Sequence, residues 1–450
     1  MQREIGALWS EKKVVRRETQ RAVTPWGGLR VFVEFLRRRG YREQVRRHLP
    51  IRLESPNALE PAQTFTAFLV AVLAGARRFA HAARRRGDRA LQALPGMERF
   101  PSDDTIRNLF KRFTHGMVYR CFEPLWAWQL GRLPQGAEGY SLDLDSAVLE
   151  RYGQQEGARR GYNPRKHGRA SQPPLLAVLA EAPFIVPGWL RSGNCSAARG
   201  TVEFLKEALA RLGERARIRV VRAEAGFFEE PLLNFLEARG LAYLVVGRMT
   251  PWLKRDAARV GTWRELEAEY AAGEFRLRLW NWEQARRFVV IRERVREEKR
   301  SLGRKLLEVP GYTFRVWVTS REDPPQDVWR DDNRRAEVEK RIAELKYDLA
   351  ADDFCLQEFF ATAAAFCAIL MLFNLLAEFQ RATGLPGYRQ PATRRVHIFL
   401  GGAILGRAGH RTLLHLSSAG GGLEHRNALF DRLLAYGSPT SPKLSLKPGT

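Results

Sequence analysis

The sequence predicts an α/β protein whose core is interrupted by a β-rich insertion and preceded by a basic helical domain. Three observations predict it: helical three- and four-residue spacing over 1–135, strands alternating with amphipathic helices over 136–248, and period-two alternation over 249–331. Helical spacing returns over 332–384 and completes the core, and 385–450 reads as a basic C-terminal tail. Strands that alternate with helices are typical of a sheet covered by helices.

Composition indicates a folded protein with an anionic partner. Of the 450 residues, 45% are hydrophobic and 10% aromatic, so the net charge of +25 does not stem from disorder. Such a charge indicates nucleic acid or an anionic membrane surface, and arginines spread along the whole chain favour double-stranded DNA. A basic protein with no such partner remains an alternative.

The helical domain concentrates positive charge. Residues 1–120 hold 25 Lys and Arg against 11 Asp and Glu, and 25 − 11 gives +14. We therefore expect this domain to contact phosphates. The stretch "PSDDTIRNLFKRF" places Ser102 as the cap of a helix, which is either part of a helix-turn-helix or a plain surface helix.

Two further features bear on location. The four cysteines show no CxxC spacing, and the charged N-terminus "MQREIGALWSEKKVVRRETQ" does not read as a signal peptide, so a reducing cytoplasm is expected. The stretch "FFATAAAFCAILMLFNLL", 359–376, is long enough to span a membrane. We interpret it as a core helix, since a helix apolar on all sides is also what a large domain buries.

Two aspartates mark the first predicted strand of the core. In "SLDLDSAVLE", period-two alternation places Asp143 and Asp145 on one face of the strand and leucines on the other. Neighbouring carboxylates repel each other unless a divalent cation lies between them and further acidic groups. Two solvated aspartates at a strand end are the alternative interpretation.

Other acidic residues stand at suitable places. Glu224 ends the strand "IRVVRAEAG", at the edge where open α/β sheets gather ligands. Later, Arg335, Glu339 and Lys346 recur at helical spacing and share one face of a helix. That face either belongs to a site or is a solvated face with ion pairs. Trp329, just before these residues, either packs in the core or stacks on an unpaired base.

These residues stand in blocks that resemble the DDE transposases of bacterial insertion sequences. The block "LDLDSAVLERYGQQEGARRGYNPRKHGRASQPPLLAV" is similar to the one around that family's first aspartate, and "VVRAEAGFF" to the second. In "NRRAEVEKRIAELKYD", the residues Arg335, Glu339 and Lys346 keep the family's spacing. "VTPWGGL" and "PSDDTIRNLF" also look like family elements, so the resemblance covers most of the chain in collinear order.

The resemblance implies a ribonuclease-H-like core and an enzyme that binds transposon ends, cleaves phosphodiester bonds and joins the freed 3′ hydroxyl to target DNA. It implies that Asp145, Glu224 and Glu339 hold two metal ions, Mg²⁺ or Mn²⁺, with Asp143 as a supporting residue. Arg335 and Lys346 would hold DNA phosphates. The expected partners are terminal inverted repeats, target DNA and a second copy of the chain, in the nucleoid of a bacterial cytoplasm and without a membrane.

The sequence departs from the family pattern at several positions. Glu224 stands where the family has aspartate, Ala147 where it usually has threonine, and Asp332 at the tyrosine position; Gln172-Pro173 replaces an expected Tyr-His. The extra methylene of glutamate moves its carboxylate by about 1.5 Å. A catalytically degenerate or repurposed transposase that binds DNA without cutting it is therefore the alternative function.

Overall fold

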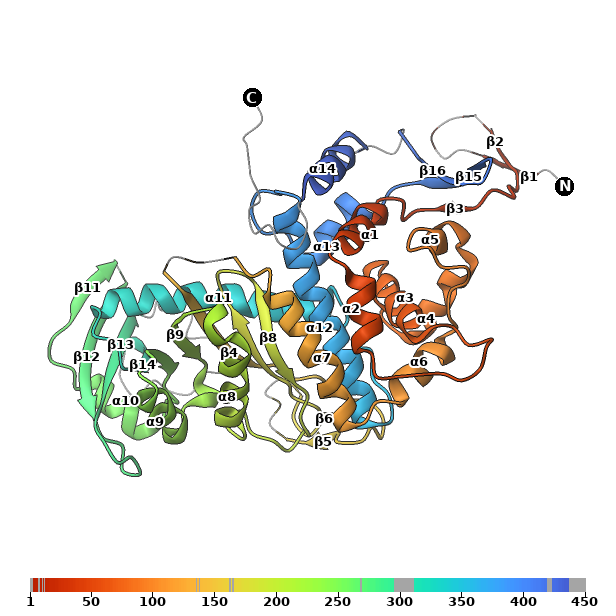
Figure 1. Ribbon diagram of the computed structural model, residues 1–450. Helices are drawn as coiled ribbons and strands as arrows, with labels where there is room; N and C mark the ends of the chain where they lie inside the picture. The colour runs from red at the N-terminus through yellow and green to blue at the C-terminus, as the bar shows by residue number, and fades with distance from the viewer. Residues whose placement is uncertain are drawn as a thin grey trace.

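The computed structural model places a helical region beside a large sheet, with one long helix between them (Figure 1). The residues that it describes are 3–6, 9, 11, 13–134, 136, 138–161, 163, 166–267, 269–294, 311–418 and 423–436.

A nine-stranded mixed sheet forms the centre of the fold, which confirms the predicted α/β class. Its order is β11-β12-β13-β14-β10-β9-β4-β7-β8. β4 pairs in parallel with β9, and β9 with β10, whereas the other neighbours are antiparallel. The strands are β4 (Tyr140–Ser146), β7 (Leu175–Leu179), β8 (Phe184–Trp189), β9 (Ile218–Ala223), β10 (Tyr243–Val246), β11 (Arg264–Glu267), β12 (Tyr270–Leu277), β13 (Arg286–Arg294) and β14 (Tyr312–Thr319).

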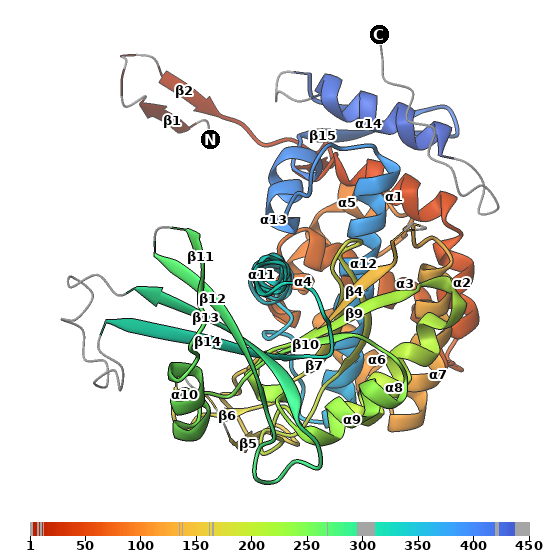
Figure 2. The same cartoon turned by 90° about the vertical axis from the view of Figure 1, so that its left-hand side faces the viewer.

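The predicted β-rich insertion, 249–331, continues this sheet instead of forming a sheet of its own. Its last strand, β14, pairs antiparallel with β10, and β11 to β13 follow outward, beside a short helix α10 (Pro251–Ala258). Without β14, the edge of β10 would expose unpaired backbone groups. Figure 2 shows these strands reaching away from the helical region.

Helices cover both faces of the sheet, and the alternation along each strand decides which helices a given side chain contacts. Leu142 and Leu144 of β4 pack in one core with α8 (Thr201–Leu212) and α9 (Glu230–Ala238). Val178 of β7 instead packs in the core that contains α12. Asp143 and Asp145 therefore point toward α11 (Pro325–Tyr347), which begins before the predicted boundary at 332. Figure 2 shows α11 end-on above the sheet.

The apolar helix α12 (Phe359–Ala382) lies between the sheet and the helical region (Figure 1). By length and composition it could cross a membrane, but 89% of its most apolar stretch is buried inside the protein. Asn374 accepts a hydrogen bond from the Ile185 N–H (2.8 Å) and donates to the Ile185 carbonyl (2.9 Å), which fixes α12 to β8. α12 is therefore buried inside the protein, as expected of a core helix.

The helical region shares its core with α12, as apolar side chains of its helices and of α12 belong to one cluster. Ser102 caps α6 as predicted, since its hydroxyl accepts from the Thr105 N–H (3.1 Å). The region is not helical throughout, because three short strands precede its first helix. These elements are β1 (Arg3–Gly6), β2 (Lys13–Arg16), β3 (Val23–Thr24), α1 (Leu29–Arg38), α2 (Tyr41–His48), α3 (Pro61–Leu73), α4 (Phe79–Ala83), α5 (Arg89–Ala93), α6 (Asp103–Lys111) and α7 (His115–Leu130).

The predicted C-terminal tail, 385–450, is folded over much of its described part. Its strand β15 pairs with both β16 and β3, so the two ends of the chain share a small sheet. Gly28 is required at this junction, because a Cβ there would lie 1.8 Å from the Ile398 carbonyl oxygen. Residues 437–450 of the predicted tail lie outside the described residues. The elements are α13 (Pro391–Arg394), a π-helical turn (Arg395–Phe399), β15 (Ala403–Ala408), β16 (Arg411–Leu416) and α14 (Leu423–Ala435).

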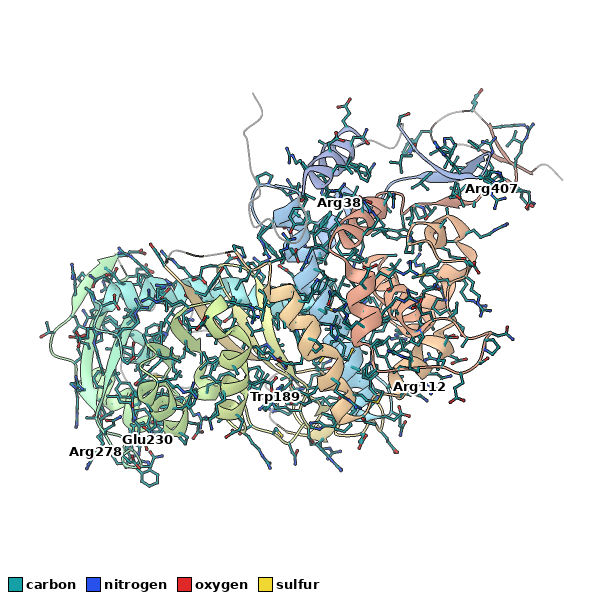
Figure 3. All side chains as sticks on the ribbon, in the orientation of Figure 1. Arg38, Arg112, Trp189, Glu230, Arg278 and Arg407 are labelled. Atoms are coloured by element: carbon teal, nitrogen blue, oxygen red, sulfur yellow. The ribbon has the colours of Figure 1, made fainter. Side chains whose placement is uncertain are left out.

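Arginines occur over the whole length of the molecule. Figure 3 labels Arg112 in the helical region, Arg407 in the strand β15 of the small sheet, and Arg278 at the far end of the large sheet. Positive charge therefore extends over both parts of the fold, as a long polyanion would require.

Candidate functional site

The three predicted acidic residues come from two neighbouring strands of the sheet and from the helix α11 that lies over them. Asp145 lies in β4, Glu224 directly follows β9, and Glu339 lies on α11. β4 and β9 are parallel neighbours, with Leu144 opposite Ala223. Asp145 and Glu224 are the next residues of the two chain segments, so they lie side by side at the same edge of the sheet. This is the edge where α/β sheets gather ligands.

The carboxylates interact strongly with one another. Burial first, and then the charges of Glu224 and Glu339, raise the pKa of Asp145 to about 7. Burial also raises the pKa of Glu224, and the Glu339 charge adds to it, although Arg335 and a backbone hydrogen bond from Ser146 act in the opposite direction. Each group thus holds protons that a solvated carboxyl group would release. A cation would relieve this repulsion.

Arg335 is the buried positive charge of the site. Its Nη2 lies 3.7 Å from Oδ2 of Asp145, and only 6% of the residue is exposed. Its Nε and Nη2 have no hydrogen-bond partner within the described residues. Two buried N–H groups without an acceptor suit a phosphate oxygen, since guanidinium groups bind phosphate through such pairs.

The donor chemistry of the site fits Mg²⁺ or Mn²⁺, which prefer carboxylate oxygens. Two of these carboxyl groups are also unstable in their charged form, as their raised pKa values show. Within the described part of the chain, however, no three His, Cys, Asp or Glu side chains are grouped tightly enough to hold a metal ion. Metal binding would therefore require the carboxylates to draw closer together.

Asp143 has a different surrounding from Asp145. Its two carboxylate oxygens accept from Arg222 at 2.6 and 2.7 Å, and both residues are almost completely buried. Arg222 also donates to the backbone carbonyl (2.7 Å) and the carboxylate (3.2 Å) of Asp331 in α11. Asp143 and Arg222 thus fix the helix that carries Glu339 to the sheet, which is a positioning role.

Lys346 lies near the site, but its ammonium group already has partners within the protein. Its Nζ donates to the Val148 carbonyl (2.9 Å) and lies 4.0 Å from a carboxylate oxygen of Asp352. Together with Glu339 it lines a groove of about 830 Å³.

Trp329 is not brought together with the carboxylates. Its ring packs on Tyr270, with the two ring centroids 5.2 Å apart. The two rings line a separate hollow of about 340 Å³ that also contains Glu267 and Glu293. The contact with Tyr270 fits core packing, the alternative to base stacking, and a role of Trp329 in DNA binding stays a prediction.

The groove beside Glu339 contains residues that the sequence motifs did not single out. Arg78 and Arg107 line it from the helical region, and Tyr152 and Lys166 from the loop between β4 and β7. A signal for the loop was present, because its basic residues lie within the block that resembles the family's first aspartate segment. On the other side of Glu339, a cavity of about 230 Å³ is lined by Arg315, Asp332 and Arg335, among others.

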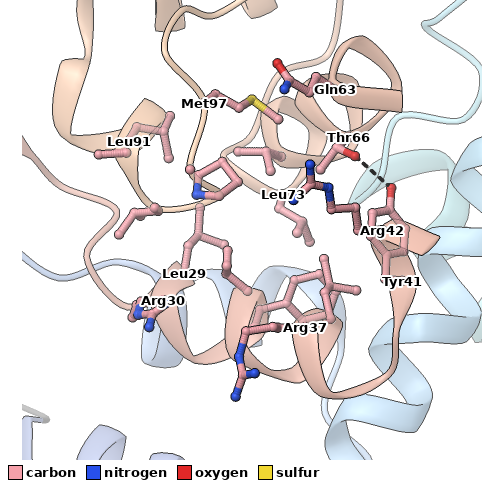
Figure 4. Close-up of a pocket in the computed structure, with 18 of the residues that line it drawn as sticks. Leu29, Arg30, Arg37, Tyr41, Arg42, Gln63, Thr66, Leu73, Leu91 and Met97 are labelled. Atoms are coloured by element: carbon pink, nitrogen blue, oxygen red, sulfur yellow. Dashed lines mark hydrogen bonds between the residues drawn. The ribbon is translucent and has the colours of Figure 1, made fainter. Parts of the chain in front are cut away.

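A second large hollow, of about 640 Å³, lies in the helical region (Figure 4). Its walls are mostly apolar side chains from α1, α3 and α5, and Tyr41 shares a hydrogen bond with Thr66 across 3.2 Å. Glu60 in its lining is paired with Arg46 at 2.5 Å. Its lining also includes Arg30, Arg37 and Arg42 but none of the three site carboxylates, so the hollow does not contribute to this site.

Comparison with known proteins gives a family and similar solved structures. The model of the family described as transposase DDE domain, group 1, matches residues 7–434. No curated protein matches the chain. Among solved structures, the chain is similar to the piggyBac transposase in its synaptic complex with hairpin DNA, with 14% identity, a TM-score of 0.47, and coverage of 85% of this chain and 82% of that chain.

Proposed function

This chain belongs to the DDE-domain transposases of group 1, and from that premise we propose that it cleaves the ends of a mobile DNA element and joins them to a target. In the first step, a water oxygen attacks the phosphorus and the 3′ oxygen leaves as a hydroxyl group. In the second, that hydroxyl oxygen attacks a target phosphate and displaces its bridging oxygen. Transposases are DNA-binding enzymes of recombination, which agrees with the net charge of +25.

The observation that carries this proposal is the meeting of Asp145, Glu224 and Glu339 from three distant segments, with charges that act on one another. These carboxylates would hold Mg²⁺ or Mn²⁺, which supplies Lewis-acid activation of the attacking oxygen and stabilises the leaving one. The raised pKa values mean that metal binding releases protons from Asp145 and Glu224.

The cationic side chains hold the DNA in this proposal. Arg335 offers its two buried N–H groups to the phosphate that is cut. Lys346 adds a donor in the groove beside Glu339. Asp143 and Arg222 keep α11 in register with β4 and thereby hold Glu339 opposite Asp145.

We also propose a ribonuclease-H-like core for the segments 136–248 and 332–384. Its support is the arrangement β8-β7-β4-β9-β10, in which β4 has an antiparallel neighbour on one side and parallel strands on the other. The basic helices of 1–135 supply end binding in this assignment. Two copies of the chain would bring two DNA ends together, and the four free cysteines agree with a cytoplasmic, nucleoid location.

A specific observation favours a second candidate, a degenerate transposase that binds DNA without cutting it. Glu224 replaces the family's aspartate, and the described carboxylates are not grouped as a metal site. Both candidates predict salt-sensitive DNA binding, so affinity does not separate them.

Cleavage separates the two candidates. The substrate is a labelled duplex made from the DNA that flanks the gene, incubated with Mg²⁺ or Mn²⁺. Cutting at a defined position by the wild type, and its loss in Asp145→Asn and Glu339→Gln, supports the enzyme. Binding without cutting in either metal supports the degenerate copy.

A further inference from the structure

The loop between β4 and β7 is a basic connection next to the site. Residues 151–172 contain six Lys and Arg against one Glu, and 6 − 1 gives +5. β4 ends at Ser146, directly after Asp145, so the loop begins where the candidate site ends. A short hairpin, β5 (Arg159–Arg160) with β6 (Ala170–Ser171), folds part of it.

Tyr152 is the exposed aromatic residue of this loop. Its side chain is 70% exposed, yet its orientation is fixed, because its hydroxyl donates to Oε2 of Glu150 at 2.7 Å. Lys166 donates to the same carboxylate (2.8 Å) and to the Tyr152 hydroxyl (3.2 Å). The guanidinium of Arg169 lies 4.6 Å from the ring centroid. Arg169 thus lies over the ring and Lys166 holds its hydroxyl, while most of this large ring remains exposed.

The ring also faces the catalytic region. Tyr152 and Lys166 line the same groove of about 830 Å³ as Glu339 and Lys346. A strand that leaves the cut phosphate along this groove would pass the tyrosine ring.

We propose that Tyr152, with Lys166 and Arg169, binds an unpaired nucleotide of the DNA strand beside the cut. The ring stacks on the base, and the two cations bind the flanking phosphates, the combination that proteins use for single strands. This assignment deepens the proposed function and rests on it for the identity of the DNA. Trp329 is less suited, because Tyr270 packs on its ring and its hollow is separate from the groove that Glu339 lines.

Binding of two DNA probes tests the assignment without any catalysis. One probe is a duplex with a short single-stranded overhang that carries 2-aminopurine, and the other is the blunt duplex of the same length. Both are titrated in EDTA. The wild type should bind the overhang about tenfold more tightly than the blunt duplex, the gain expected of one stacked base. The 2-aminopurine fluorescence should be quenched on binding.

Variants locate the effect. Tyr152→Ala should abolish both the preference and the quenching, whereas Tyr152→Phe should keep both, because stacking needs only the ring. Trp280→Ala is the matched control, as Trp280 is 92% exposed in the connection between β12 and β13 and should leave the preference unchanged. Lys166→Gln and Arg169→Gln should weaken binding of the overhang probe and reduce its salt dependence by about one ion each.

Two results would overturn the assignment: equal affinity of the wild type for the two probes, or a preference that survives Tyr152→Ala. Its failure is distinguishable from that of the proposed function, because this assay contains no metal and the other measures cutting. If the protein prefers the overhang through Tyr152 but never cuts DNA, the role of Tyr152 stands and the proposed cleavage activity is wrong.

Discussion

The burial of Asp145 and its repulsion by Glu224 and Glu339 predict that removing its charge stabilises the metal-free protein. The perturbation is Asp145→Asn, which keeps the shape of the side chain and removes its charge. The pKa of Asp145 is raised from 3.8 to about 7, and each unit corresponds to about 1.4 kcal/mol. Ionising Asp145 in the folded state therefore costs on the order of 4 kcal/mol at about pH 8.

The direction of the pH dependence follows from the raised pKa. The folded protein holds the Asp145 proton more firmly than the unfolded chain, so this group's contribution to stability is largest below its ordinary pKa and is lost as the pH rises toward about 7. Asp145→Asn should gain little at about pH 4 and the full amount at about pH 8. With about 2.1 cal/mol/K of unfolding entropy per residue, 4 kcal/mol raises the Tm of a chain of this length by about 4 °C.

The assay is thermal unfolding in EDTA at both pH values, followed by circular dichroism. A Tm of Asp145→Asn at or below that of the wild type at about pH 8 would refute the reasoning. Adding Mg²⁺ supplies a second readout at the same pH. It should raise the Tm of the wild type and leave that of Asp145→Asn nearly unchanged, because a cation that binds only the folded protein stabilises it.

Three further predictions concern neighbouring residues. Asp143→Asn should destabilise the protein by about 1–3 kcal/mol, because Arg222 loses its two hydrogen bonds to the Asp143 carboxylate and keeps only the Asp331 carboxylate as a charged partner; an unchanged denaturation midpoint would contradict that ion pair. Glu224→Asp should lower the cleavage rate if the site has adjusted to the longer side chain, whereas a rise in Mn²⁺ would indicate a copy that decayed from an aspartate ancestor. Asn374→Leu should lower the free energy of unfolding by about 1–3 kcal/mol, since it leaves the Ile185 N–H and carbonyl without their hydrogen-bond partner. Full stability would show that these groups find other partners.

Features that depend on residues close together in the sequence could be predicted. Period-two alternation placed Asp143 and Asp145 on one strand face, and Ser102 was identified as a helix cap, because both features depend on neighbouring residues. The strand and helix pattern of 136–248 also indicated the α/β class, since alternation along the chain reflects layers in space.

Long-range pairing could not be predicted in the same way. Nothing in the strands of 249–331 indicates that β14 pairs with β10, because the same alternation suits a separate sheet. The sheet that joins β3 to β15 connects the two ends of the chain, and its pairing has no local signal. The different surroundings of Asp143 and Asp145 depend on Arg222, which comes from another strand.

The candidate site shows the same division. The residue types and their spacing singled out Asp143, Asp145, Glu224 and Glu339. The family resemblance then selected Asp145, Glu224 and Glu339, whose roles remain predictions. Tyr152 was missed, because a tyrosine in a basic loop has no distinctive spacing, and only the fold shows that it shares a groove with Glu339.

The central claim is that these three carboxylates, distant in sequence, form one metal centre. Bound Fe²⁺ with ascorbate and peroxide cuts a polypeptide backbone close to the ion, so the fragment ends map the site directly. We expect cuts near 145, 224 and 339 in the same protein, suppressed by excess Mg²⁺ and lost in Asp145→Asn. Cuts confined to other segments, or a pattern that Asp145→Asn leaves unchanged, would contradict the claim.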